Sequence, residues 1–380
     1  MADLLFTLPS KVVFSIRAVE RIGIFASEFG SRVLLMVDDI LSDMEQTQKV
    51  KSLLETKGLK CIVFDDIPLH ATSKAVESAV SIAKASKSQL VIGMGGVRTL
   101  SIAKSTAKML ALDEPFDTYL SGEPFGPASL PYIEIPTTCR NPMMLTDRAI
   151  VVDARDRSVK KLTLNSYPEY IIIDPPLSVT LSAKYSVTAM LDTFLHSLEG
   201  YISTKSNFLS HLLFLESFPL LISNIRRAHE EPGNITIRQY ACQAGLLSAF
   251  GLSMSFPGLG HAISHIISGK FRVPQAAVAS ILIPHIMEYG VRICPDKIEA
   301  VGESIGETSR SGRLESAKHL LEYMRHLIAS LRLPLRLSDF SISYEQLIGT
   351  ADMVSSFEGL SYLPEPVTTA EIVELLKQAY

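Results

Sequence analysis

This 380-residue sequence has no long uninterrupted apolar run, little cysteine and no marked excess of charge of either sign. No run approaches the roughly 18 apolar residues that a membrane-spanning helix needs. The first residues, Met1 to Phe14, lack the basic stretch followed by an apolar stretch that marks a secretory signal. We therefore expect a cytoplasmic protein with no membrane partner.

The cysteines and the charge balance exclude further classes of protein. Cys61, Cys139, Cys242 and Cys294 are widely separated, which fits reduced thiols better than a disulfide framework. A net charge of −4 with 20% charged residues argues against a nucleic-acid partner. A chain of 380 residues exceeds what one hydrophobic core usually supports, so two domains are expected.

The first part of the chain alternates short β-rich runs with helical stretches. Strands are predicted over 31–39, 59–67, 89–96, 131–138, 148–154 and 170–177, and helices over 43–58 and 73–86. This alternation is typical of a parallel sheet wrapped by helices. The sequence thus predicts an α/β domain over residues 1–177.

From about Ser178 onward the pattern changes to longer helical segments. Helices are predicted over 182–203, 210–230, 236–255, 315–332 and 368–380. Asp174-Pro175-Pro176 is the natural hinge before them, because proline fixes φ and disfavours helix in the preceding residue. The second domain, over residues 178–380, is therefore expected to be all α.

Two pairs of polar residues with helical spacing stand in this second part. Asp192 and His196 are four residues apart, as are His261 and His265. Residues four apart project from one face of a helix, so two such helices can close around one divalent ion. Carboxylate with imidazole suits Fe²⁺ or Zn²⁺. The alternative to a metal site is an aspartate that caps a helix N-terminus next to a histidine packed in the core. An aspartate and a histidine four residues apart more often have these structural roles.

A glycine-bearing turn follows the predicted strand 89–96. Gly95-Gly96 at the start of a helix offers backbone N–H groups to a phosphate. Asp38, at the end of another strand, is placed to bind a ribose and repel a 2′-phosphate. Thr137 and Thr138 add hydroxyls at a third strand end. Each residue could instead serve only its local turn or cap.

In chain order these pieces resemble the iron-containing (group III) alcohol dehydrogenase family. The resemblance rests on LPSKVVF, the GG-x-x-x-x-x-x-AK segment, IPTT, IIIDPPL, LDTFLHSLEGY, GLGHAISH and ILIPHIMEYG. It implies a dinucleotide-binding α/β domain and a helical domain of the dehydroquinate synthase-like architecture, with the active site in the cleft between them. It also implies hydride transfer between NAD(P)H and a small alcohol or aldehyde polarised by Fe²⁺ or Zn²⁺, in a homodimer.

The resemblance assigns the metal ligands residue by residue. Asp192, His196 and His261 fall on three ligand positions, and Gln275 falls where the family has a fourth ligand, a histidine. A glutamine oxygen is a weaker donor than imidazole. Three protein ligands with water would still form an open catalytic site. His265 falls on the position of substrate-proximal or proton-relay chemistry and is the predicted catalytic residue.

The predicted cofactor-binding residues depart further from the family pattern. They are Asp38, Gly95, Gly96, Val97, Arg98, Thr137, Thr138 and Lys161. Val97 replaces a glycine, which puts a β-branched side chain where the backbone should approach the pyrophosphate. Arg98 replaces a serine and offers a phosphate partner. Ser101 replaces an aspartate. Asp38 predicts NAD(H) in preference to NADP(H).

Three functions agree with this pattern. The first is a metal- and NAD(H)-dependent oxidoreductase of small alcohols and aldehydes. The second is a degenerate member of the family without dehydrogenase activity, which acts as a binding or assembly protein. The third is a metal-independent enzyme like maleylacetate reductase, whose glycine loop also lacks the aspartate at the position of Ser101.

Overall fold

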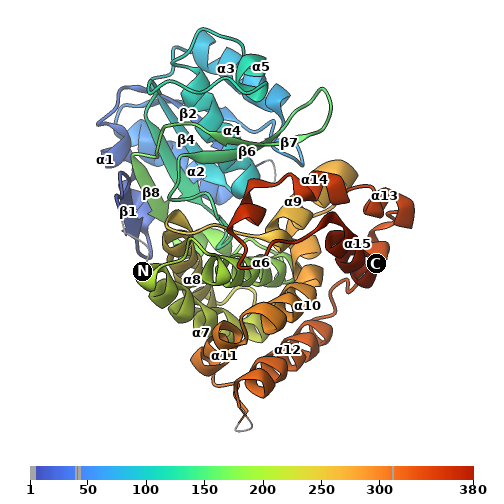
Figure 1. Cartoon of the computed structure of the whole chain (residues 1–380). Coiled ribbons are helices and arrows are strands. Elements are labelled where there is room, and N and C mark those ends of the chain that lie inside the picture. Colours follow the sequence, from blue (N-terminus) through green and yellow to red (C-terminus); the bar gives the residue numbers. More distant parts are fainter. Residues whose placement is uncertain (1–5, 39–40, 42–43, 310–311) are drawn as a thin grey trace. The chain divides into compact units, whose positions relative to one another are not determined.

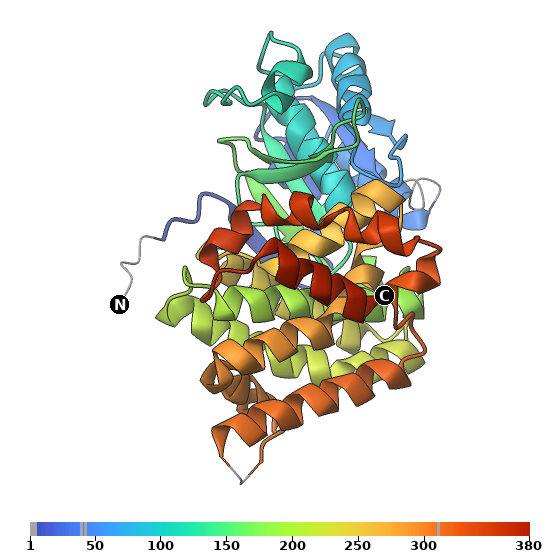
Figure 2. The same cartoon turned by 45° about the vertical axis from the view of Figure 1, so that its right-hand side comes forward.

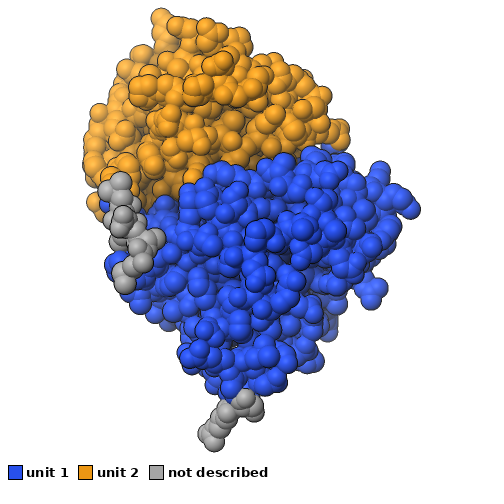
Figure 3. Space-filling model, in the orientation of Figure 1, with its two compact units in different colours: residues 1–6, 181–380 blue, residues 7–180 orange. Residues whose placement is uncertain are grey.

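The computed structural model describes residues 6–38, 41, 44–309 and 312–380. It divides into two compact units, Thr7–Thr180 and Leu181–Tyr380 together with Phe6 (Figure 3). The predicted boundary after residue 177 falls inside a short turn, η3 (Pro175–Ser178). Asp39, which ends the predicted strand 31–39, and Asp43, which begins the predicted helix 43–58, lie outside the described residues.

The first unit contains a parallel sheet, as the alternating pattern predicts. Its six strands are β1 (Lys11–Phe14), β2 (Arg32–Val37), β3 (Lys60–Phe64), β4 (Leu90–Gly95), β5 (Tyr132–Pro136) and β8 (Tyr170–Ile173). They are ordered β1-β8-β5-β4-β2-β3, and every neighbouring pair is parallel (Figure 1). The α/β class of this unit is therefore confirmed.

Helices cover both faces of this sheet. Alternate residues of β2 point to opposite sides, so that Leu35 packs in one core and Leu34 in the other. The first core contains residues of α1 (Ile22–Ala26) and α2 (Glu45–Thr56). The second contains residues of α3 (Ser73–Ala85), α4 (Val97–Met109) and α5 (Phe116–Leu120). Such two-sided burial explains why the strands are nearly continuous apolar runs.

One predicted strand lies outside the parallel sheet. Residues 148–154, expected as a further strand, form β6 (Arg148–Val152), which pairs antiparallel with β7 (Val159–Thr163) in a two-stranded sheet. β7 is not among the predicted strands, and the residues of 148–154 do not indicate which strand they pair with. The short connection between the two strands suits an antiparallel pair, because a parallel pair needs a long crossover.

The second unit is helical, as the sequence predicts. Its main helices are α6 (Ala183–Ile202), α7 (Phe208–Glu230), α8 (Ile235–Ser253), α9 (Leu259–Phe271), α10 (Gln275–Ile293), α11 (Pro295–Ile305), α12 (Arg313–Ser330) and α15 (Thr369–Ala379). Shorter helices are α13 (Tyr344–Ile348) and α14 (Ala351–Ser355). Figure 2 shows α15, in dark red, near the end of the chain. Within its described residues this unit contains no strand.

Close packing fixes α6 in the middle of the helical unit. Gly200 of α6 and Gly251 of α8 both face the ring of Phe214, which belongs to α7. A Cβ added at either glycine would stand 2.5 Å from a carbon of that ring. The two glycines therefore let three helices approach one another, and α6 provides a rigid support for its polar side chains.

Two helices of this unit, α7 and α10, are long and apolar enough to cross a membrane by length and composition alone. The most apolar window of α10 is 72% buried inside the protein, and that of α7 is 44% buried. Core helices of a helical domain meet the same test of length and composition. The window of α10 is thus mostly buried, as in a core helix, whereas less than half of the window of α7 is buried.

Candidate active site

Two helices of the second unit bring four polar side chains together. Asp192 and His196 lie one turn apart in the middle of α6, and His261 and His265 lie one turn apart in α9. The exposed fractions are 0% for Asp192, 1% for His196, 0% for His261 and 8% for His265. Both predicted i,i+4 pairs are thus helical and buried, and they come from neighbouring helices.

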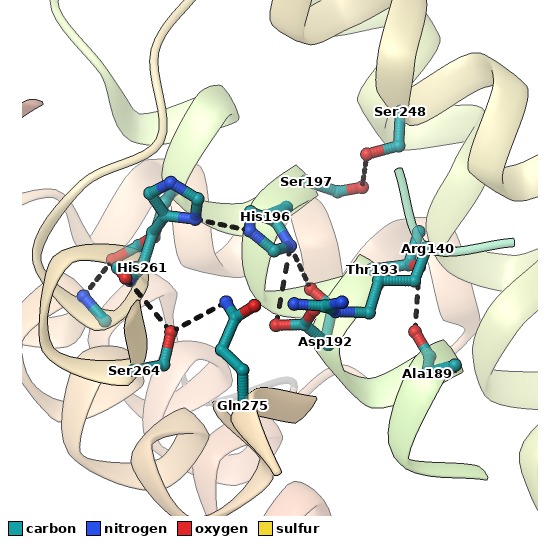
Figure 4. A network of polar contacts seen from close by, with 12 residues as sticks. Arg140, Ala189, Asp192, Thr193, His196, Ser197, Ser248, His261, Ser264 and Gln275 are labelled. Atoms are coloured by element: carbon teal, nitrogen blue, oxygen red, sulfur yellow. Dashed lines mark hydrogen bonds and ion pairs between the residues drawn. The ribbon is translucent and has the colours of Figure 1, made fainter. Parts of the chain in front are cut away.

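The two histidines of different helices are joined directly. His196 Nε2 lies 2.6 Å from His261 Nδ1, and His196 Nδ1 lies 2.7 Å from the backbone oxygen of Asp192 (Figure 4). A carbonyl oxygen only accepts, so neutral His196 carries its proton on Nδ1, and its Nε2 accepts from His261. The rings of His261 and His265 lie 4.3 Å apart between centroids. The four residues form one connected group.

A buried carboxylate, which the sequence analysis did not single out, holds α9 against α6. Glu199 accepts hydrogen bonds from the backbone N–H groups of Gly258 (3.0 Å), Gly260 and His261 (3.1 Å) at the start of α9. Its negative charge also suits the positive end of the helix dipole. Burial raises the pKa of Glu199 to about 7, although the three N–H groups oppose this shift. Through α9, Glu199 positions His261.

The position of Glu199 in the sequence could have indicated that it belongs to this site. Asp192, His196 and Glu199 are spaced i, i+4 and i+7, which places all three along one stripe of α6. Glutamate on a stripe that is otherwise buried needs partners. The structure supplies them from a segment about 60 residues later in the chain, which no local pattern reveals.

Gln275 is the first residue of α10 and interacts with α9. Its Nε2 donates to Ser264 Oγ at 3.1 Å, and Ser264 Oγ donates to the backbone oxygen of His261 at 3.0 Å (Figure 4). Pro274 precedes it as the N-cap residue. The side chain of Gln275, at the fourth predicted ligand position, is therefore held by its amide nitrogen. Its amide oxygen is the atom that could bind a metal ion.

The donor set of this site fits Fe²⁺ or Zn²⁺ by chemical type. One carboxylate and two imidazoles are buried together, and the Nδ1–H of His196 faces a carbonyl, as metal-bound histidines commonly arrange it. Two nitrogens bound tetrahedrally to one ion lie about 3.3 Å apart. His196 Nε2 and His261 Nδ1 are only 2.6 Å apart, so the side chains are not spread around a central point. Among the described residues, no group of three or more His, Cys, Asp or Glu is arranged to hold a metal. Loading would replace the hydrogen bond between His196 and His261 with bonds from the two rings to the ion.

The α/β unit contains a second polar cluster at the carboxyl ends of its strands. β2 continues to β3 on one side of the sheet, whereas β4 continues to β5 on the other. The gap between β2 and β4 is therefore the point at which the strand order reverses, where open α/β sheets bind ligands. Asp38 follows β2 at this point, Gly95 ends β4, and Gly96 is the N-cap residue of α4.

The glycine turn forms its helix despite Val97. None of Gly95, Gly96 and Val97 has a positive φ, and Val97 is the first residue of α4. A β-branched residue adopts such a φ without strain. Gly95 is needed for space instead, because an added Cβ would stand 2.8 Å from Cβ of Thr99. The valine therefore does not prevent the turn that presents the N-terminus of α4.

Asp38 and Arg98, both predicted to bind the cofactor, bind each other. The Arg98 guanidinium donates to both carboxylate oxygens of Asp38, with Nε 3.3 Å from Oδ2. Arg98 also donates to the backbone oxygen of Pro68 at 3.2 Å, and Thr99 Oγ1 donates to Asp38 at 3.2 Å. The sequence gives no sign that these two residues meet, because they lie 60 positions apart.

The other predicted cofactor residues divide between two places. The N–H of Thr137 donates to the backbone oxygen of Gly95 at 3.0 Å, which ties the segment after β5 to the glycine turn. Thr138 Oγ1 bonds to the backbone of Arg140. Lys161 lies in β7, opposite Ile150, in the two-stranded sheet and not at a carboxyl end of the parallel strands. These roles stay predictions.

A buried ionic cluster next to the glycine turn was also missed. Lys104 of α4 donates to the backbone oxygens of Met143 and Thr146, each at 3.0 Å, and lies 3.7 Å from Glu134 of β5. Asn141 donates to the other carboxylate oxygen of Glu134. Burial lowers the pKa of Lys104 and raises that of Glu134 to about 7. The cluster fixes the segment that follows β5.

The fold and the two polar clusters define a two-part enzyme architecture, and comparison with known proteins names its family. A model of the iron-containing alcohol dehydrogenase matches residues 9–175, and a model of the C-terminal part of the Fe-containing alcohol dehydrogenase family matches residues 186–380. The chain belongs to the iron-containing alcohol dehydrogenase family. Membership places it among oxidoreductases of alcohols and aldehydes.

Individual relatives are distant but cover nearly the whole chain. A sulfoacetaldehyde reductase of Bilophila wadsworthia is 23% identical over 353 residues, which is 92% of this chain and 91% of the relative. A maleylacetate reductase of Sphingobium indicum is 25% identical over 379 residues, 98% and 96% of the two chains. A crystal structure of 1,3-propanediol oxidoreductase matches with a TM-score of 0.95 at 20% identity and covers 100% of both chains. This last likeness establishes the fold.

Proposed function

We propose that this protein is a metal-dependent oxidoreductase that transfers hydride between NAD(H) and a small alcohol or aldehyde. The observation that carries the proposal is the buried group of Asp192, His196, His261 and His265, formed by α6 and α9. These are the residue types that bind Fe²⁺ or Zn²⁺, and burying four of them together is costly without a ligand or a function.

In this proposal Asp192, His196 and His261 hold the metal, with Gln275 as a weak fourth donor. A bound Fe²⁺ or Zn²⁺ would supply a Lewis acid that stabilises the alkoxide. Glu199 keeps His261 in place through the first turn of α9. His265, which packs on His261 and keeps 8% exposure, takes up and returns the proton of the substrate hydroxyl.

The nicotinamide cofactor is assigned to the α/β unit. Asp38, Gly95 and Gly96 stand at the switch point of the sheet, and Thr137, after the neighbouring β5, donates to Gly95. The N-terminus of α4 presents N–H groups suited to a pyrophosphate. The relatives named for sulfoacetaldehyde, maleylacetate and 1,3-propanediol support a small substrate. Their names differ too widely to fix its identity.

Metal content and cofactor binding, measured on one anaerobically purified sample, test this proposal. We expect about one Fe²⁺ or Zn²⁺ per chain by elemental analysis, and quenching or enhancement of NADH fluorescence on binding. Metal below about a tenth of the chain concentration after incubation with Fe²⁺ or Zn²⁺ would contradict metal dependence. No NAD(H) binding at millimolar concentration would contradict oxidoreductase activity and favour a binding or assembly role.

A second candidate is a metal-independent reductase. Gln275 in place of a histidine ligand and the direct hydrogen bond between His196 and His261 favour it, as does the maleylacetate reductase relative that spans 98% of the chain. Activity that persists after complete removal of metal by a chelator would select this candidate. Loss of activity on chelation, with recovery on adding Fe²⁺ or Zn²⁺, would select the first.

The proposal also includes a cytoplasmic homodimer. None of the four cysteines, all within the described residues, takes part in a disulfide. This fits a reducing compartment. The dimer rests on the family resemblance, and sedimentation of the purified protein tests it. A single species at the monomer mass of 41.7 kDa would contradict it.

A further inference from the structure

The ion pair between Asp38 and Arg98 occupies the place where a dinucleotide-binding sheet reads the ribose of its cofactor. Asp38 directly follows β2, and Arg98 is the second residue of α4. An acidic side chain at this strand end binds the ribose hydroxyls and repels a 2′-phosphate. In this chain the acid does not act alone, because the guanidinium lies against both of its oxygens.

We propose that Arg98 determines cofactor specificity: by neutralising Asp38 it lets this enzyme accept NADPH as well as NADH. The inference rests on the proposed NAD(H) site. A lone carboxylate makes burial of a nearby 2′-phosphate unfavourable, whereas a carboxylate paired with a guanidinium carries no net charge. The NADH preference that Asp38 alone predicts is therefore weakened.

The geometry suits a guanidinium that can turn toward a phosphate. Arg98 keeps 22% and Asp38 keeps 14% of the side chain exposed, so both members of the pair are partly accessible to solvent. The backbone oxygen of Pro68 holds Nη1 of Arg98 from a separate segment. A guanidinium has five donors in a planar fork and binds a phosphate through two of them at once.

Thr99 gives Asp38 a hydrogen-bond partner that does not depend on Arg98. Its Oγ1 donates to Asp38 Oδ2 from the next position of α4, so Asp38 retains a hydrogen-bond partner if Arg98 turns away. With NADH bound, Asp38 can accept from the ribose while Arg98 remains beside it. With NADPH bound, Arg98 pairs with the 2′-phosphate and Thr99 continues to hold Asp38. One site thus serves both cofactors.

Fluorescence titration of the full-length protein with NADH and with NADPH tests the inference. We expect the two Kd values of the wild type to agree within about tenfold. Arg98→Ser exposes the charge of Asp38 and should raise the Kd for NADPH at least about tenfold, while the Kd for NADH changes less than about threefold. Asp38→Ala should lower the Kd for NADPH relative to that for NADH.

A matched control removes a different arginine–aspartate pair of the same unit. Arg155 pairs with Asp153 and Asp117 and belongs to none of the proposed cofactor-binding residues. Arg155→Ser should leave the NADPH-to-NADH ratio of Kd values unchanged. Thermal unfolding of each variant confirms that the titrations report folded protein.

Two results would overturn the inference. One is a wild-type preference for NADH greater than about a hundredfold, and the other is an Arg98→Ser variant with an unchanged ratio of Kd values. Failure of the proposed function looks different, because then neither NADH nor NADPH would bind to the wild type. Binding of both with an Arg98-dependent ratio supports the inference even if the substrate is unknown.

Discussion

The two polar clusters of this chain are built from different groups: buried side chains in the helical unit and backbone groups in the α/β unit. In the helical unit, Asp192, His196 and His261 are buried side chains, and a buried carboxylate, Glu199, holds one of their helices by its backbone. In the α/β unit, the turn at Gly95 and the start of α4 present backbone groups, while the side chains around them, such as Arg98, depart from the family pattern.

This difference explains which departures the fold tolerates. A site made of backbone N–H groups depends on the path of the chain, and Val97 leaves that path intact because no positive φ is required there. A site made of side-chain donors depends on the identity of each residue. Gln275 in place of an imidazole is therefore a larger chemical change than Val97 in place of a glycine.

The strongest test of the comparison is Asp192→Ala. If side-chain donors carry the chemistry, losing this carboxylate should remove the metal and lower kcat/KM by about 10³-fold, or ~4 kcal/mol. Elemental analysis and initial rates measure both effects. Ser197→Ala is the matched control, since its hydroxyl lies on the same helix but faces Ser248. A variant that retains metal and rate would show that this cluster is structural.

The support of α9 by Glu199 can be removed separately. Glu199→Ala leaves the N–H groups of Gly258, Gly260 and His261 without their acceptor, which should cost about 3 kcal/mol of unfolding free energy. Glu199→Gln keeps one carbonyl acceptor and should cost about half as much. Denaturant unfolding measures both values. A loss below about 1 kcal/mol in the alanine variant would show that α9 holds its own position.

The buried cluster of the α/β unit should make stability depend on pH. Because the pKa of Glu134 rises from 4.5 to about 7 on folding, the folded state holds a proton that the unfolded chain releases. Glu134 by itself should therefore lower the unfolding free energy by about 2–3 kcal/mol as the pH rises from 4.5 to 7. Denaturant unfolding at a series of pH values measures this slope.

Glu134→Gln identifies the group responsible for that slope. The amide keeps an acceptor for Asn141 but does not titrate, so the variant should lose the part of the slope that Glu134 contributes. Glu199, whose pKa is also raised to about 7, contributes in the same direction and should leave a smaller slope. An unchanged slope in the variant would exclude Glu134 as its source.

The smallest expected effect concerns the fourth ligand position. Gln275→His restores an imidazole and should tighten metal binding by about tenfold, with a parallel gain in kcat/KM. Gln275→Leu, which provides no donor, is the control. Metal titration followed by rate measurement separates the two quantities. Tighter metal binding without any gain in rate would indicate that the reaction does not use a fourth metal ligand at position 275.

Local patterns accounted for most of the fold. Five strands of the parallel sheet, β2, β3, β4, β5 and β8, were predictable because each is a short apolar run, and α6, α7, α8, α12 and α15 because each has a helical periodicity of apolar residues. No strand was predicted over β1 and no helix over α10. The capping box at Thr368 and Glu371, which begins α15, is equally local. The strand β6 was predicted, but its pairing was not, because strand pairing depends on a partner, β7, that the sequence did not reveal.

By itself, the sequence determined the α/β and helical parts and the residue types of both polar clusters, since periodicity and spacing act within a few residues. Only the tertiary structure decided which of those residues meet. Asp38 meets Arg98, His196 meets His261, and Glu199 meets the start of α9. Each contact joins segments some 60 residues apart, and such contacts depend on the packing of whole elements, which no local pattern encodes.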